Sequence, residues 1–272
     1  MRIPVRGLTF DVSVDGPSDG PAVVLLHGFP QNLCEWRRIT PALHAAGLRT
    51  VAPNQRGYSP AARPIDTDAY VMKECVADAV ALLDELDIDR AHVVGHDWGA
   101  LVAWHLAADF PDRVDTLTAV SVPHAAAFTD AIEHDEDQRQ RSSYVGLFRR
   151  AGRAEDLLLE DDGRRMREMF SGCPPELIDD YVSPMLDRAA LTGALEWYRA
   201  MSPESLACGD VTVPTTYVWG DNDLAVGPVA ARACSRYVTG PYRFLPLTGV
   251  SHWIPDEVPA ALAEAILTQI ED

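Results

Sequence analysis

Several features of secreted, membrane-bound or metal-binding proteins are missing from this sequence. The first eleven residues carry scattered charges where a secretory signal needs an apolar stretch. No uninterrupted apolar run approaches the roughly 20 residues that cross a bilayer. The five cysteines are odd in number and widely spaced, without a Cys-x-x-Cys pair, which argues against a disulfide framework or a zinc site. We therefore expect a soluble, cytoplasmic protein.

Basic residues are also scarce. Lys and Arg number 23 against 41 Asp and Glu, so the formal net charge is -18 at neutral pH. A surface of this sign repels phosphate backbones and anionic headgroups, which argues against nucleic acid or an anionic membrane as the partner. The same charge would repel anionic substrates, but solubility is the simpler explanation for it.

The chain is long enough to bury a full core, because 47% of its 272 residues are hydrophobic. Up to residue 123, short apolar runs typical of buried strands alternate with amphipathic stretches typical of helices. The expected strands are 8–14 at a sheet edge, 22–26, 48–52, 91–94 and 114–122, and the expected helices are 68–86 and 98–108. This alternation predicts an α/β fold with a mostly parallel sheet flanked by helices.

The pattern changes after Pro123. Charged helical segments replace the strand-like runs, at 133–150, 155–169, 176–186 and 188–201. Strand-like runs return at 214–219 and 242–247, before a closing helix at 260–270. We therefore divide the chain into a core domain, residues 1–123 and 207–272, and a helical cap domain, residues 124–206. The cap is expected over the carboxyl ends of the strands, where open α/β sheets bind ligands.

Asp97 lies on a tight turn between an expected strand and an expected helix. Gly95 and Gly99 flank it in Gly95-His-Asp-Trp-Gly99, a pattern typical of a nucleophile elbow with Asp in the usual Ser position. Such a turn would aim the next amide and the helix dipole at the carboxylate. Taken alone, Asp97 is equally well explained as the N-cap of the helix that begins at Trp98.

Two further stretches favour a nucleophile. His27-Gly-Phe-Pro30 follows a buried strand, so the amide of Phe29 could join that of Trp98 in an oxyanion hole. His252 lies in a loop between a strand and the last helix. The chain order of nucleophile, acid and histidine then matches the triad order of the α/β-hydrolase fold. We interpret His252 as the base, whereas surface or capping roles are the default for the other seven histidines.

The triad acid is expected after the strand 215–219, in Gly220-Asp-Asn-Asp223. We assign it to Asp223, with Asp221 as the alternative, because such loops often use an Asp to form the turn. The end of the preceding strand, residues 121–124, offers no carboxylate.

With these motifs in this order, followed by His252-Trp253, the chain resembles the α/β-hydrolase-fold epoxide hydrolases over nearly its whole length. The resemblance implies that two cap tyrosines bind and protonate the epoxide oxygen. Tyr198, in Leu195-Glu-Trp-Tyr-Arg199, is similar to one of them, and Tyr144, ahead of Phe148 and Gly152, is similar to the other. Tyr181 is the alternative for Tyr144.

An Asp nucleophile suits epoxide opening because the attacked carbon is saturated. A serine would leave a stable ether, whereas a carboxylate leaves an ester that water can cleave. His252, oriented by Asp223, would activate that water, and the amides of Phe29 and Trp98 would stabilise the oxyanion. A phenol, with a pKa of about 10, is a competent acid for the departing alkoxide. The expected substrates are a small apolar epoxide and water; no metal or organic cofactor is required.

Other functions of the same fold are alternatives. A haloalkane dehalogenase would share the nucleophile and could hold halide with Trp98 and Trp197, but Phe29 stands where many dehalogenases carry Asn. A fluoroacetate dehalogenase would carry Arg in place of Trp98, and an esterase would need a Gly-x-Ser-x-Gly motif that is missing. A non-catalytic binding protein on the same fold would be expected to lack the acid, the base or one of the tyrosines. The sequence has a candidate for each of them. The sequence predicts neither the particular epoxide nor the oligomeric state.

Overall fold

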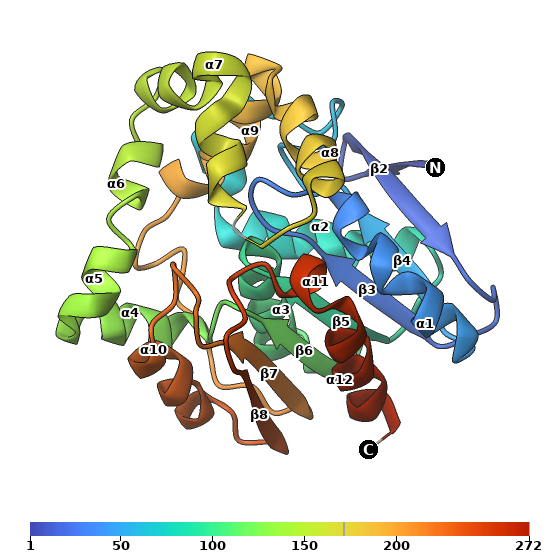
Figure 1. Cartoon of the computed structure of the whole chain (residues 1–272). Coiled ribbons are helices and arrows are strands. Elements are labelled where there is room, and N and C mark those ends of the chain that lie inside the picture. Colours follow the sequence, from blue (N-terminus) through green and yellow to red (C-terminus); the bar gives the residue numbers. More distant parts are fainter. Residues whose placement is uncertain (171, 272) are drawn as a thin grey trace.

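A computed structural model describes residues 1–170 and 172–271 of the chain. Within this part, one eight-stranded sheet lies at the centre of the molecule (Figure 1), with the strand order β1-β2-β4-β3-β5-β6-β7-β8. β2 pairs antiparallel with β1 and β4, and the other pairs are parallel. The strands are β1 (Arg2–Val5), β2 (Leu8–Asp15), β3 (Ala22–Leu26), β4 (Arg49–Pro53), β5 (Ala91–His96), β6 (Val114–Val120), β7 (Thr215–Gly220) and β8 (Tyr242–Leu247). The predicted α/β fold is confirmed.

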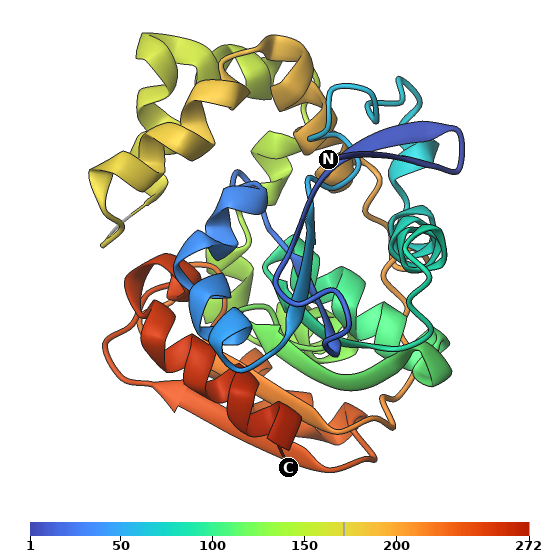
Figure 2. The ribbon, with the colours of Figure 1, turned by 90° about the vertical axis from the view of Figure 1, so that its right-hand side faces the viewer.

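Helices cover both faces of the sheet, which explains why its central strands are continuous apolar runs. Every residue of β3 and β7 is buried, and each fully buried Val or Leu stabilises the fold by about 1.5–3 kcal/mol. Figure 2 shows α12 (Pro259–Glu271) and α1 (Thr40–Ala45) on one face and α2 (Met72–Glu85) on the other. The central helix α3 (Trp98–Asp109) packs on the same face as α2 and is buried over nearly its whole length.

The edge position expected for residues 8–14 is wrong. β1 pairs with β2 from Arg2↔Asp11 to Val5↔Leu8, so β2 is the second strand of the sheet. β1 is only four residues long and alternates exposed and buried positions, with a proline among them. A run of four residues that contains a proline carries little strand signal in the sequence.

Six helices connect β6 to β7 in the part of the chain that the structure describes: α4 (Ala125–His134), α5 (Glu136–Arg141), α6 (Val145–Phe148), α7 (Arg153–Met169), α8 (Pro175–Met185) and α9 (Arg188–Arg199). Figure 1 shows α6 to α9 together at the top of the view, while α4 contacts α10 (Pro228–Ala233) lower down.

Two helices of this segment differ from the prediction. The single helix expected at 133–150 is divided, because the extended residue Asp135 accepts a hydrogen bond from the amide of Gln138 and starts a new helix there. α7 is interrupted at 160–163, where Asp161, Asp162 and Gly163 have positive φ. Among the described residues, none of the helices has both the length and the apolar composition needed to cross a membrane.

Candidate active site

Asp97 occupies a strained backbone conformation between β5 and α3. Its φ of 52° and ψ of -118° are unfavourable for a residue with a side chain. The turn needs glycine on both sides, because a Cβ at Gly95 would lie 2.1 Å from the Gly99 carbonyl oxygen and one at Gly99 would lie 2.0 Å from that of Leu26. The Asp97 side chain makes no capping hydrogen bond to α3, so helix capping does not explain this residue.

The loop after β3 supplies a hydrogen-bond donor to Asp97. The amide of Phe29 lies 2.8 Å from Oδ1 of the carboxylate. Only glycine fits beside it, because a Cβ on Gly28 would lie 2.4 Å from the Cβ of Asp97. Among the described residues, no hydrogen bond joins the Trp98 amide to this carboxylate, so a share of Trp98 in an oxyanion hole stays a prediction.

His252 lies between two carboxylates. Its Nδ1 is 2.8 Å from Oδ2 of Asp223, and its Nε2 is 3.5 Å from Oδ2 of Asp97. The other oxygen of Asp223 accepts the amides of Ala225 and Val226 at 2.7 and 3.0 Å, which fixes the orientation of this buried side chain. The structure therefore brings together Asp97, His252 and Asp223.

Asp221, the alternative acid, lies apart from this contact. Its side chain is on the exposed turn after β7, where Oδ1 accepts the amide of Gly249 at 2.6 Å. The residue forms a turn, as its type commonly does in such loops.

The charges of Asp97 and His252 stabilise each other. Burial by itself would lower the pKa of His252, but the carboxylates of Asp223 and Asp97 raise it to about 10. Burial would raise the pKa of Asp97, yet the contact with His252 and the amide of Phe29 keep it below its ordinary value. At neutral pH the pair is therefore a carboxylate and an imidazolium.

A cavity of about 480 Å³ opens onto this pair. Tyr144 and Tyr198 line it together with Asp97 and His252, and most of its other lining residues are apolar. The two tyrosine rings meet edge to face at a centroid distance of 6.3 Å. Burial raises the pKa of both phenols well above 10, so both keep their protons at neutral pH.

Tyr181, the alternative to Tyr144, lies elsewhere. It is fully buried, its hydroxyl donates to Oδ1 of Asp256 at 2.7 Å, and it is not one of the residues that line the cavity.

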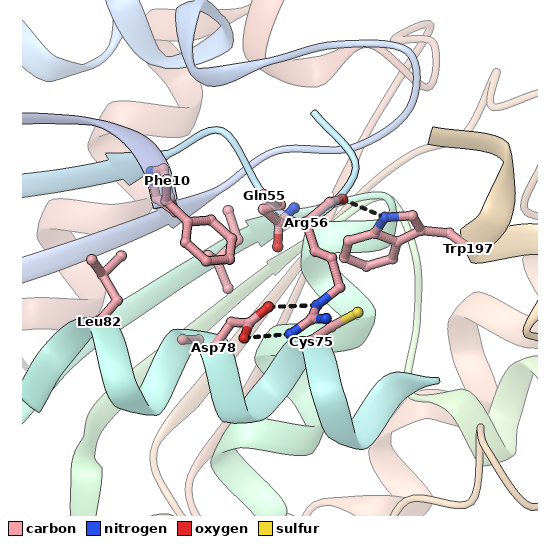
Figure 3. Close-up of a pocket in the computed structure, with 10 residues that line it drawn as sticks. Phe10, Gln55, Arg56, Cys75, Asp78, Leu82 and Trp197 are labelled. Atoms are coloured by element: carbon pink, nitrogen blue, oxygen red, sulfur yellow. Dashed lines mark hydrogen bonds and ion pairs between the residues drawn. The ribbon is translucent and has the colours of Figure 1, made fainter. Parts of the chain in front are cut away.

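A second cavity, of about 20 Å³, is too small for a substrate. Arg56 and Asp78 fill its polar side with two hydrogen bonds of 2.7 Å (Figure 3). The indole N–H of Trp197 donates to the carbonyl oxygen of Arg56 at 2.8 Å. Trp197 is therefore unable to hold a halide in the large cavity, which it does not line.

The sequence analysis did not identify a buried pair beside Asp97, formed by Glu35 and His96. Their Oε1 and Nδ1 atoms lie 2.6 Å apart, and both side chains are fully buried. Nε2 of His96 is 2.9 Å from the carbonyl oxygen of His252, which also accepts the hydroxyl of Ser121 at 2.7 Å. Nε2 donates to that carbonyl, so Nδ1 is the ring nitrogen that faces the Glu35 carboxyl group.

Burial raises the pKa of Glu35 to about 7, although the neighbouring His96 opposes this shift. This pair anchors the backbone of His252. The sequence contains one slight indication that Glu35 is buried, because it stands directly before Trp36, a large apolar residue.

Metal ligation has no candidate among residues 1–170 and 172–271, where no group of three or more His, Cys, Asp or Glu side chains is arranged to hold an ion.

Comparison with known proteins agrees with this geometry. A family model described as the α/β hydrolase fold matches residues 21–257. The chain is 32% identical to an AB hydrolase superfamily protein of Bacillus subtilis, over 98% of this chain and 96% of that one. It is 30% identical to epoxide hydrolase A of Mycobacterium tuberculosis, over 97% and 95%. The solved structure of epoxide hydrolase A from Mycobacterium thermoresistibile matches 100% of this chain and 97% of that one, at 29% identity and a TM-score of 0.87. The resemblance seen in the motifs is confirmed, and the chain belongs to the epoxide hydrolases of the α/β-hydrolase fold family.

Proposed function

We propose that the protein is an epoxide hydrolase that converts a small apolar epoxide and water to a vicinal diol through a covalent ester on Asp97. One observation carries the proposal: a single cavity joins a strained carboxylate, an imidazolium and two protonated phenols, namely Asp97, His252, Tyr144 and Tyr198. The family relatives that bear the name epoxide hydrolase support it.

In the first half-reaction Asp97 attacks an epoxide carbon. The Phe29 amide holds Oδ1, which leaves Oδ2 as the nucleophilic oxygen. As the new C–O bond forms, the ring C–O bond breaks, and the oxygen takes a proton from Tyr144 or Tyr198. The other phenol donates a hydrogen bond to the same oxygen, because both tyrosines line one cavity.

In the second half-reaction water cleaves the ester. Esterification removes the negative charge of Asp97, so His252 releases its proton, which replaces the one that the tyrosine gave. The neutral imidazole, held by Asp223, then takes a proton from water as the hydroxide attacks the ester carbonyl. The Phe29 amide stabilises the oxyanion, and we assign the same role to the amide of Trp98. The diol leaves with the carboxylate and imidazolium restored, so protons balance over the cycle.

We further propose that residues 124–206 form a cap domain on a core made of residues 1–123 and 207–272. Tyr144 lies at the start of α6 and Tyr198 near the end of α9, and both line the cavity that Asp97 of the core also lines. Gln138 of α5 donates to the carbonyl oxygen of Ala225 at 2.8 Å and accepts the amide of Gly227 at 2.9 Å. These bonds tie the proposed cap to the loop that carries Asp223.

The test is a panel of terminal, internal and aryl epoxides beside haloalkanes, with both diol and halide measured. We expect diols from epoxides and none from an Asp97→Ala variant. Halide release without diol formation would instead identify a dehalogenase.

A further inference from the structure

Asp256 carries a buried carboxyl group that the proposed reaction does not use. The residue is 1% exposed, and within the described part of the chain no Lys, Arg or His side chain forms an ion pair with it. Its two oxygens accept hydrogen bonds from neutral groups, the hydroxyl of Tyr181 and the amide of Gln31, each at 2.7 Å. Burial raises the pKa of Asp256 above its ordinary value, since a charge is unfavourable there. An apolar residue would avoid this cost, which points to a role for the carboxyl group beyond stability.

Asp256 lies four positions after the proposed base, in α11 (Ile254–Glu257). A helix of one turn has little stability of its own, so contacts with the rest of the molecule must fix this segment. On the core side, the carbonyl oxygen of His252 lies 2.9 Å from Nε2 of His96 and accepts the hydroxyl of Ser121 at 2.7 Å. The core therefore holds the beginning of the segment.

The proposed cap contacts the same segment. Figure 1 shows α8 above α11, and Tyr181 of α8 donates its hydrogen bond to Asp256 of α11. The indole N–H of Trp253 donates to the carbonyl oxygen of Met169, at the end of α7, at 2.7 Å. The ring of Trp253 also packs on that of Phe170, at a centroid distance of 4.4 Å. All these contacts reach the core within four positions of the proposed base.

We infer that Tyr181 and Asp256 are positioning residues that couple the docking of the cap on the core to the placement of His252. While their hydrogen bond is made, α11 is held in place and the imidazole is kept where it activates water against the ester. Ester formation uses Asp97 and the two tyrosines of the cavity, so it does not depend on this contact. The inference rests on the proposed function and adds a control on its second half-reaction.

Two substitutions remove the hydrogen bond with little change in side-chain volume, Tyr181→Phe and Asp256→Leu. Rapid-quench mass spectrometry of a single turnover measures ester formation and ester hydrolysis separately. We expect ester formation within about twofold of the wild type and hydrolysis slower by about tenfold or more, because a small displacement of a catalytic group costs up to about a hundredfold in rate. Unchanged hydrolysis, or an equal loss in both half-reactions, would overturn the inference.

Two further variants are controls. Asp256→Asn keeps an acceptor for Tyr181, and its new amide can donate to Oε1 of Gln31, which has no hydrogen-bond partner within residues 1–170 and 172–271. We expect hydrolysis within about threefold of the wild type; a loss as large as in Asp256→Leu would overturn the inference. Tyr70→Phe removes another hydroxyl of a buried tyrosine, which donates to the carbonyl oxygen of Pro64 at 2.9 Å, and should leave both rates unchanged.

Hydrogen exchange separates this inference from the proposed function. If the wild type hydrolyses no epoxide, the proposed function fails, but the coupling is still measurable in the backbone amides of residues 251–257. In Tyr181→Phe these amides should exchange about tenfold faster than in the wild type, because the segment opens more often. In Tyr70→Phe they should exchange at the wild-type rate. Wild-type exchange in Tyr181→Phe would overturn the inference whatever the activity of the protein.

Discussion

Nε2 of His252 lies 3.5 Å from Oδ2 of Asp97, and this contact links the protonation of the base to the charge of the nucleophile. While Asp97 is ionised, it joins Asp223 in raising the pKa of His252 to about 10. In the proposed ester Asp97 carries no charge, so we expect the pKa of His252 to be lower at that stage. Under the proposed mechanism, His252 would therefore become able to accept a proton only after the ester has formed, when its hydrolysis needs a base.

The two half-reactions should consequently depend on pH in different ways. Ester formation should be constant over about pH 6 to 9, because Asp97 stays ionised there. Ester hydrolysis should fall about tenfold per pH unit below the midpoint for His252 in the esterified enzyme, which lies below 10. Rapid-quench mass spectrometry of a single turnover measures both rates. If the pH midpoint of ester hydrolysis lay near 10, loss of the Asp97 charge would have no effect on the pKa of His252.

The same contact contributes to stability. The pKa of folded His252 lies above the ordinary value of 6.5, so its contribution is full below that pH and is lost as pH rises through about 10. The pKa of Asp97 is lowered, so its contribution is present above 3.8 and is lost as pH falls through the folded value. An NMR titration of His252 in Asp97→Asn should show a lower pKa than in the wild type; an unchanged value would contradict the coupling.

Replacing the base should trap the ester. In His252→Gln, alkylation of Asp97 proceeds but hydrolysis slows by about a thousandfold or more, because water has no base. Intact-protein mass spectrometry should then show a gain equal to the mass of one epoxide. Asp221→Asn is the matched control in the acid loop and should keep turnover within about twofold, since Asp221 only forms a turn. The assignment fails if His252→Gln turns over without a detectable adduct.

Removing the phenols should block ring opening. Tyr144→Phe and Tyr198→Phe should each slow alkylation by about tenfold to a hundredfold, and the double variant should abolish it, because the alkoxide then leaves without an acid. Tyr181→Phe controls for loss of a buried hydroxyl, since that group binds Asp256 away from the cavity. Burst kinetics of alkylation report the effect. Normal bursts in the double variant would reject the acid assignment.

Local sequence pattern was enough to locate Asp97 and His252, because each lies in a short motif at the junction of two elements. It assigned the acid to Asp223 and kept Asp221, two positions away, as the alternative. The loop turns one carboxylate inward to the amides of Ala225 and Val226 and leaves the other at the surface.

Long-range contacts account for what the sequence did not reveal. Glu35 and His96 are 61 positions apart and meet only because β3 lies beside β5 in the sheet. β1 is recognisable as a strand only through its pairing with β2.

The buried pair of Arg56 and Asp78 should be important for stability (Figure 3). Asp78→Asn leaves a buried guanidinium without its carboxylate, and we expect a loss of about 3–5 kcal/mol in the free energy of unfolding. Asp84→Asn on the same helix α2 is the control, because Asp84 is exposed in its pair with Arg113 and such surface pairs contribute under about 1 kcal/mol. Chemical denaturation compares the two variants. Equal losses of unfolding free energy in the two variants would contradict a larger contribution from the buried pair of Arg56 and Asp78.

The central claim is that Asp97 forms the covalent ester, and a single turnover in ¹⁸O-labelled water tests it most directly. Water attacks the ester carbonyl, so the account predicts that the first turnover places ¹⁸O in the Asp97 carboxylate and leaves the diol unlabelled. Peptide mass spectrometry locates the label. Label in the diol after the first turnover, with none on Asp97, would show direct attack of water on the epoxide and contradict the account.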